Sequence, residues 1–414
     1  MKYALACAAA LAVTLPRLSY GQDCKSAVLN PCINSDNLWV HPGASRFVAI
    51  GGTETAKAGQ SGFGLVLGYQ SRPVVLRVFS PGPPGTDQNA IDNQVNATFL
   101  WNLGITDRLE LGAALPVTLG QGGAGLGPIT AATAPLKGTV LRDLRFGVAF
   151  AIIPRARVDV DATNAQSKAH PAGNAFAVTA RFEMSAPTGD GEAFAGERGA
   201  VLVPSIAADY RRGRFFAGSE LGLRLRGTTE LLGARIGSQA VVGLGFGVDI
   251  LPKELLAAAA EVRMLPGFVS QGDVVQAGGR FSSQSNDRLA APAEWALSVR
   301  TAPFFGGDLG FQLSGGSAIP LADDSALTNP RFRFTFGVRY APLDRDTDGD
   351  GILDKFDACP REPEGFRSKD DTAPHDGCPH APPPAAAPVE FTTTPPVAPA
   401  PSAPTPAPAG GSTP

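Results

Sequence analysis

The sequence has few ionisable side chains and few residues that bind metals. Charged residues make up 18% of its 414 positions, and it contains four histidines, five cysteines and a formal net charge of −3. Soluble globular chains usually carry about 25% charged residues. This balance excludes a strongly basic nucleic-acid surface. The scarcity of histidine and cysteine leaves little material for a metal enzyme or a zinc array. The 49 glycines and 37 prolines are typical of turn-rich sheet proteins.

Long apolar runs are also missing, except at the start of the chain. Residues 3–15 form an apolar stretch after Lys2, and Ser19 and Gly21 fit the small-residue positions of a secretory cleavage site. We therefore expect residues 1–21 to be a signal peptide. No later stretch offers about 18 uninterrupted apolar residues, so a second membrane helix is excluded. A membrane form of the exported chain would have to be a closed β-barrel.

Cysteines are few, but their positions are informative. Removing the signal peptide discards Cys7 and leaves an even number in two pairs that are local in the sequence. An even count suits an oxidising compartment, and we expect two disulfides. The four residues are Cys24, Cys32, Cys359 and Cys378.

Between residues 61 and 341 hydrophobicity alternates with a period of two, which indicates β-strands. Phe334 and Phe336 share one face of a strand, whereas Arg333 and Arg339 take the other. These runs last about ten residues, enough for a tilted strand to cross a bilayer. We count about twelve strands by this period. The predicted fold class is all-β, an antiparallel transmembrane β-barrel with its apolar face toward lipid. A soluble all-β domain is the alternative.

The connections between these strands alternate in length, as expected when one end of a barrel carries turns and the other carries loops. Residues 153–174 form a long connection where a short turn is due. The long loops are expected near 80–88, 120–137, 188–198, 227–235, 266–291 and 315–330, and the short turns near 106–107, 211–213, 252–253 and 303–304.

Charged side chains on the predicted inner face carry both signs. They would line a water-filled pore and tune its selectivity, or they would pair across the strands and plug the lumen. About twelve strands allow either arrangement, since eight strands are just filled and sixteen leave a channel. The predicted pore-lining residues are Arg145, Arg181, Glu183, Glu220, Arg224, Glu261, Arg263, Glu294, Arg300, Arg333 and Arg339.

An acidic loop follows the last predicted strand. Residues 344–360 read DRDTDGDGILDKFDACP, in which aspartates alternate around Gly351. Ca²⁺ takes six to eight oxygen ligands, and alternate carboxylates on a turning loop supply them. A solvated acidic linker is the alternative. The predicted calcium ligands are Asp346, Asp348, Asp350, Asp354, Asp357 and the backbone carbonyl of Ile352.

The motif DxDxDGxxDxxDxCP resembles the thrombospondin type 3 calcium-binding repeat. Such repeats often follow an outer-membrane barrel in OmpA-like and OprF-like porins, and the barrel looks most like those of myxobacterial OmpA-type proteins. The motif resemblance covers residues 344–379 and supports a Cys359–Cys378 bridge. The family usually continues into a peptidoglycan-binding domain, which is not evident here. The resemblance therefore does not imply that this chain binds peptidoglycan.

Two regions flank these parts. Residues 22–60 read poorly as strand, and we assign them to a periplasmic N-terminal extension, although a partial plug of the barrel fits equally well. The calcium repeat is assigned to residues 342–380. Residues 381–414 contain 12 prolines and no helical or strand period, which indicates a disordered tail.

These features predict a porin-like barrel in the outer membrane, with its C-terminal region in the periplasm. Outer-membrane lipid, calcium and small hydrophilic solutes would be its partners, with no nucleic acid. The alternative is a closed barrel that acts as an envelope anchor or adhesin. An outer-membrane enzyme is the least favoured function, because no set of His, Ser and Asp residues converges at a strand end.

Overall fold

The computed structural model describes the barrel, most of its loops and a few positions beyond it. The predicted signal peptide and the Pro-rich tail lie outside the described residues, as does most of the acidic loop. The described residues are 24, 28–78, 86–130, 135–155, 175–251, 255–277, 280–321, 328–342, 352, 357–359, 364 and 376–379.

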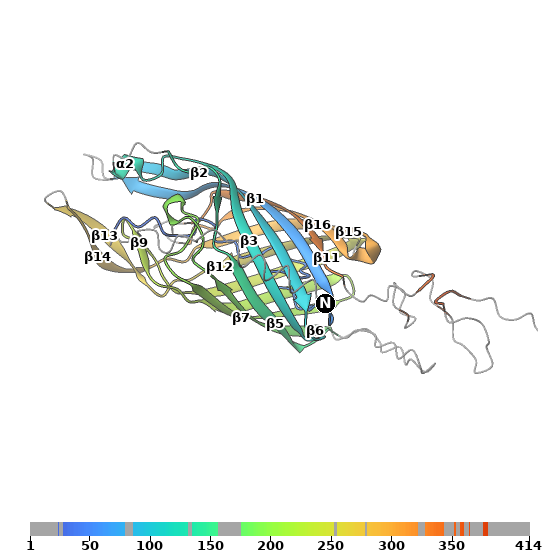
Figure 1. Cartoon of the computed structure of the whole chain (residues 1–414). Helices are drawn as coiled ribbons and strands as arrows, with labels where there is room; N and C mark the ends of the chain where they lie inside the picture. Colours follow the sequence, from blue (N-terminus) through green and yellow to red (C-terminus); the bar gives the residue numbers. More distant parts are fainter. Residues whose placement is uncertain are drawn as a thin grey trace, which may run out of the picture.

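Twelve long strands form one closed antiparallel barrel (Figure 1). Each strand pairs with its sequence neighbours in the barrel, and the last strand pairs with the first from Phe63↔Tyr340 to Ser71↔Phe332. The predicted all-β barrel of about twelve strands is confirmed. Its strands are β1 (Ser61–Val78), β2 (Thr86–Gly104), β3 (Leu109–Gly122), β5 (Arg145–Ile153), β6 (Phe176–Ser185), β7 (Val201–Arg212), β8 (Phe215–Arg224), β11 (Gln239–Leu251), β12 (Leu256–Met264), β15 (Ala293–Phe304), β16 (Leu309–Ala318) and β17 (Phe332–Tyr340).

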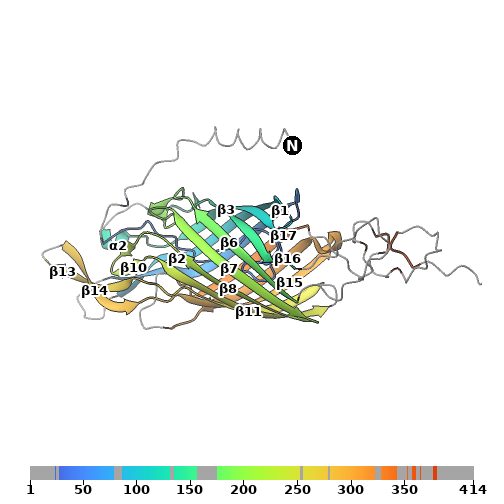
Figure 2. The same ribbon diagram turned by 90° about the horizontal axis from the view of Figure 1, so that it is seen from below.

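The smaller elements define two different ends of the barrel. The β13–β14 hairpin, β9 and α2 lie at one end, the loop end, while β17 ends at the other, the turn end (Figures 1 and 2). The predicted loops 227–235 and 266–291 contain paired strands. The small elements are β4 (Val140–Leu141), β9 (Thr229–Leu231), β10 (Ala234–Ile236), β13 (Ser270–Ala277), β14 (Arg280–Leu289), the helix α2 (Gly127–Thr130) and the 3-10 turns Gly191–Ala193 and Phe305–Gly307.

The outer wall is apolar and the inner wall is polar. On β17 the Phe334 side chain is 54% exposed, whereas its neighbour Arg333 is 7% exposed. The same alternation holds on β6, where Phe182 is exposed and Glu183 is buried. This is the reverse of a soluble domain and is the arrangement of a transmembrane barrel. No helix among the described residues is long and apolar enough to cross a bilayer.

One predicted strand is interrupted. In the sequence, Val140 starts the apolar alternation that continues through Phe146 and Val148, with Arg142 as an exception. This pattern predicts one continuous strand over 140–152 with Val140 facing lipid. The structure breaks the strand between β4 and β5, and it buries both Val140 and Arg142. The Arg142 guanidinium donates to Thr118 Oγ1 at 2.9 Å and to the side chain of Asn34. The placement of Val140 on the lipid face was therefore wrong, because the break turns this segment inward.

Candidate functional site: the filled lumen

The segment 28–60, here called the plug, runs through the barrel from end to end (Figure 1). At the loop end Leu29 forms a β-bridge with Leu231, and at the turn end the Gly59 N–H donates to the Gly104 carbonyl at 2.8 Å. The assignment of residues 22–60 to a periplasmic extension was therefore wrong for the described part. The alternative interpretation, a plug inside the barrel, is the one that the structure shows for residues 28–60.

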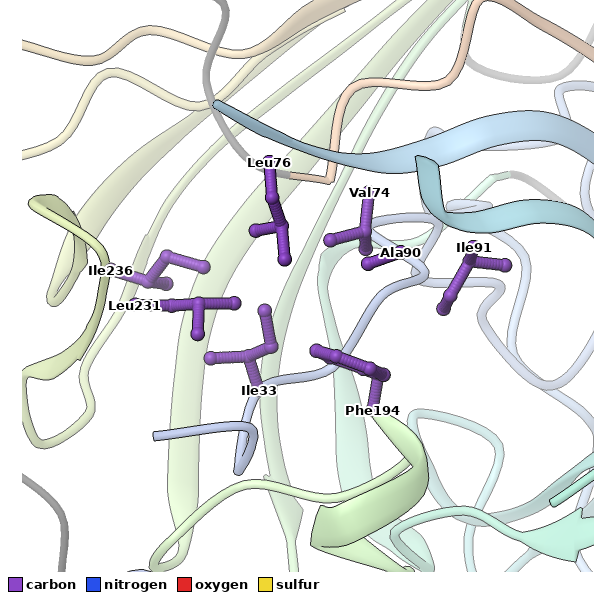
Figure 3. Packing of buried hydrophobic residues seen from close by; sticks show 8 residues of the cluster. All are labelled: Ile33, Val74, Leu76, Ala90, Ile91, Phe194, Leu231 and Ile236. Atoms are coloured by element: carbon purple, nitrogen blue, oxygen red, sulfur yellow. The ribbon is translucent and has the colours of Figure 1, made fainter. Parts of the chain in front are cut away.

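An apolar cluster covers the plug at the loop end (Figure 3). Ile33 of the plug meets Val74 and Leu76 of β1, Phe194 of the β6–β7 loop and Leu231 of β9. Each of these side chains is at most 3% exposed. Burying a side chain of this size stabilises the folded chain by about 1.5–3 kcal/mol. At the loop end, three separate parts of the chain thus meet around one plug residue.

Asp143, in the link between β4 and β5, holds the β6–β7 loop over the same end. Its carboxylate accepts hydrogen bonds from the Gly189 N–H at 2.9 Å and the Glu197 N–H at 2.8 Å. Burial raises the pKa of Asp143 to about 6, although the two N–H groups favour its charged form.

Below this cluster, ion pairs join the plug to the wall. Asp36 Oδ1 lies 2.7 Å from Arg333 Nη1, and the same guanidinium donates from Nε to Glu294 Oε2 at 2.9 Å. Arg263 Nη1 donates to the Asn37 carbonyl at 2.6 Å. The side chains of Arg333, Asp36 and Glu294 are 8%, 15% and 18% exposed, so each charge depends on its partner to offset a large part of its desolvation.

His41 marks the middle of the plug. Its Nδ1 lies 3.0 Å from Glu183 Oε1 and its Nε2 lies 3.3 Å from Glu220 Oε2, so the imidazole bridges two strands of the wall. The Trp39 indole N–H donates to the other oxygen of Glu183. Guanidinium carbons of Arg145 and Arg224 lie 4.6 and 5.1 Å from the centre of the Trp39 ring, which is cation–π geometry.

In the turn-end half, wall carboxylates bind the backbone of the plug. Glu261 accepts the N–H groups of Val48 and Ala49, each at 2.9 Å. Glu220 accepts the Gly51 N–H at 2.8 Å. A buried chain outside a sheet must find partners for its backbone polar groups. The inward glutamates supply them, which explains why so many carboxylates are tolerated in the lumen.

Two glycines of the wall leave space for an aromatic ring of the plug. Gly218 of β8 pairs with Gly245 of β11, and a Cβ on either would lie 2.4 Å from the Phe47 ring. Phe47 also meets Phe216 at a ring distance of 5.6 Å. The absence of side chains at both positions creates the space that Phe47 fills.

All eleven predicted pore-lining residues face the interior. Arg145, Arg181, Glu183, Glu220, Arg224, Glu261, Arg263 and Arg333 are buried, and Glu294, Arg300 and Arg339 are half-buried. Two cavities beside the plug have volumes of about 30 and 20 Å³, room for a water molecule or two in each. In this conformation the charges hold a filled lumen and do not line an open one.

Sequence reasoning missed several residues of this interior. Glu110 of β3 accepts the Ala56 N–H at 2.7 Å, and its place in an alternating strand was a usable signal. Gln70 and Gln94 meet across β1 and β2. Asp36 and His41 carried no signal of their own, because the sequence fits a plug and a periplasmic extension equally well for residues 22–60.

Outside the barrel, the structure joins Cys359 to Cys378, and at the loop end it joins Cys24 to Cys32. Of the predicted calcium ligands only Ile352 and Asp357 are described, and Asp346, Asp348, Asp350 and Asp354 lie outside the described residues. Asp357 Oδ1 accepts the Cys359 N–H at 2.7 Å. No group of three or more potential metal ligands occurs among the residues that the structure describes.

Fold and site together define a membrane-type β-barrel whose lumen is filled by its own N-terminal segment. No protein-family model matches the sequence, and the search of curated proteins gave no match. Solved structures resemble it only in fold.

An outer membrane channel from Pseudomonas putida F1 is 14% identical, with a TM-score of 0.43 over 70% of this chain and 98% of that one. The NanC porin is 9% identical, with a TM-score of 0.37 over 68% of this chain and 100% of that one. The Ralstonia pickettii toluene transporter TbuX is 11% identical, with a TM-score of 0.34 over 74% of this chain and 100% of that one. Similarity at this level does not identify a function.

Proposed function

We propose that the chain is an outer-membrane channel that its N-terminal segment keeps closed, and that small hydrophilic solutes pass when this segment shifts. The observation that carries the proposal is the kind of contact between plug and wall. Along the middle of the barrel many of these contacts are hydrogen bonds and ion pairs, such as Glu261 with the Val48 N–H and Asp36 with Arg333. They lie beside apolar contacts such as that of Phe47 with Phe216. Water can replace such contacts when the plug moves, which leaves a hydrophilic wall.

The wall also indicates the preferred charge of the solute. The eleven predicted pore-lining residues and Glu110 comprise seven arginines and five glutamates, a difference of +2. A cationic wall attracts anions. The opened channel is therefore expected to conduct anions better than cations.

The support for an outer-membrane location is the pairing of an apolar outer wall with a predicted signal peptide. In a closed barrel, the backbone N–H and C=O groups of every strand find hydrogen-bond partners on the neighbouring strands, so no unpaired sheet edge faces the lipid. We propose that the turn end faces the periplasm, so that the acidic loop and the tail after β17 lie there.

Planar-bilayer conductance tests the channel proposal. Wild-type protein that is folded, as shown by heat-modifiable migration, should be silent or open rarely. A variant lacking residues 28–56 should show discrete steps that scale with salt and reverse at a potential indicating anion preference. If the folded deletion variant is silent as well, the barrel is a closed structural element, and the envelope anchor or adhesin becomes the better function.

A second proposal concerns residues 342–380, which we infer bind calcium as a thrombospondin type 3-like repeat. It is supported by the aspartate spacing and by the local turn in which Asp357 Oδ1 accepts the Cys359 N–H and the Asp376 carbonyl accepts the Ala358 N–H at 2.8 Å. Calcium titration calorimetry on the full chain should give binding that Asp348→Ala with Asp350→Ala removes. Asp87→Ala with Asp92→Ala, which lie far along the chain in β2, is the control.

A further inference from the structure

A hollow of about 510 Å³ lies on the outer wall at the turn end. Its floor is Ala217 of β8, which is in register with Tyr210 of β7 on one side and Phe246 of β11 on the other. Tyr210 and Phe246 are 45% and 57% exposed, and their rings stand on either side of a single methyl group. Phe215 stacks on Phe246 with ring centres 5.9 Å apart. The hollow is therefore a groove between aromatic walls.

Two arginines stand at the rim of this groove. Arg212 and Arg214 flank Gly213 in the tight β7–β8 turn, where Gly213 has a φ of +60°. Both side chains are exposed and line the hollow. The adjacent Arg211 is paired with Glu54 at 2.7 Å, whereas no carboxylate pairs with Arg212 or Arg214 among the described residues. Within the described part of the chain, two positive charges without a carboxylate partner therefore lie beside an apolar groove.

We propose that this groove binds an anionic glycerophospholipid, with an acyl chain over Ala217 between the two rings and the phosphate on Arg212 and Arg214. The inference rests on the proposed placement of the barrel in the outer membrane, with its turn end toward the periplasm. That placement puts the aromatic groove at the acyl level and the arginines at the headgroup level of the inner leaflet. Guanidinium groups bind phosphate oxygens in paired hydrogen bonds, which suits a phosphate bridged by two arginines.

The groove favours a lipid over a protein partner for two reasons. Its walls are on the belt that faces the bilayer, and its width is that of one small residue flanked by two rings. An acyl chain fits such a slot lengthwise. The positive rim adds selectivity for an anionic headgroup, since a zwitterionic lipid brings its own cation to the same place.

Native mass spectrometry of the refolded full chain in a zwitterionic detergent tests this site. We expect one phosphatidylglycerol to stay bound at concentrations at least fivefold lower than those needed for phosphatidylethanolamine. Arg212→Gln with Arg214→Gln should reduce phosphatidylglycerol binding to the phosphatidylethanolamine level. Ala217→Leu should weaken both lipids, because it fills the groove. Two variants are the matched controls. Ala208→Leu adds the same bulk on the outer face of β7, outside the groove lining. Arg108→Gln removes an arginine from the β2–β3 turn, which also lies at the turn end.

Equal binding of the two lipids by folded protein, or phosphatidylglycerol binding that survives the double arginine variant, would overturn the assignment. Stronger binding of lipid A than of phosphatidylglycerol would also overturn it, because that lipid belongs to the other leaflet. The outcome is separable from the channel proposal. A folded barrel that stays silent without its plug but retains one phosphatidylglycerol refutes the channel and leaves the lipid site standing.

Discussion

The Asp36 carboxylate of the plug lies 2.7 Å from the Arg333 guanidinium of β17, although the two residues are 297 positions apart in the chain. Arg333 also holds Glu294 of β15, so one cation joins the plug to two strands of the wall. The plug is in this way part of the barrel's own ion-pair network, and its release requires that this network be broken.

Asp36→Ala should destabilise the folded barrel by about 1–3 kcal/mol, because Arg333 loses one buried partner and keeps the other. The measurement is the urea midpoint of the heat-modifiable form. Asp92→Ala is the control: its carboxylate lies 3.5 Å from Arg72 Nε with both side chains 47% exposed, so its loss should cost under about 1 kcal/mol. Equal effects of the two variants would contradict a structural role for the buried pair.

Gly245→Leu should expel Phe47 from its place on the wall, since even a Cβ there would lie 2.4 Å from the ring. We expect a barrel that remains folded, with more frequent channel openings and faster proteolysis within residues 44–52. Gly68→Ala is the matched control. A Cβ at Gly68 meets only Thr335 Cγ2 at 3.9 Å and the Phe334 carbonyl at 4.0 Å. Unchanged openings in Gly245→Leu would show that Phe47 does not retain the plug.

His41→Leu should leave the carboxylates of Glu183 and Glu220 without the imidazole between them. Removing one partner from a buried charged group costs about 3–5 kcal/mol. The loss should be largest near pH 7.5 and should shrink toward pH 4.5, as acid neutralises the carboxylates. Urea midpoints at the two pH values measure it. In the triple variant His41→Leu, Glu183→Gln, Glu220→Gln, most of this pH dependence of the urea midpoint should be absent. If the triple variant keeps the pH dependence, groups other than Glu183 and Glu220 cause it.

Asp143 should produce a pH dependence in the wild-type protein. Its pKa is raised from 3.8 to about 6 in the folded chain, so the folded state binds a proton that the unfolded state has already lost. Stability should therefore fall as the pH rises from about 4 to about 6, by about 2–3 kcal/mol in total, and stay level above that. Asp143→Asn should remove this slope relative to the wild type. Parallel curves for both proteins from pH 4 to pH 7.5 would contradict it.

The barrel could be predicted because one rule acts locally along every strand. Phe334 and Arg333 face opposite ways since successive side chains alternate across a strand, and this needs no knowledge of the neighbours. The plug follows no such rule. Trp39 and His41 lie inside because Glu183 and Glu220 are placed on two other strands, which only the assembled barrel brings together.

Arg142 shows the same limit within the barrel. It stood out as an exception to the alternation, yet the reason is a strand break that turns it toward Thr118 and the plug residue Asn34. The inward charges were likewise recognised, but the choice between an open and a filled lumen depended on residues 28–60. A polar segment without strand period has the same pattern whether it lies in water or inside a polar wall.

The position of the plug inside a closed ring of strands also constrains the order of assembly. The plug leads directly into β1 at the turn end, and two cavities beside it have volumes of only about 30 and 20 Å³. The ring closes only when β1 meets β17, as in the pairing of Phe63 with Tyr340. Contacts between the two ends of a chain form slowly, because the whole intervening loop must first be ordered. We therefore expect the N-terminal segment to be in place before β1 meets β17, and the meeting of these two strands to be the slow step of folding.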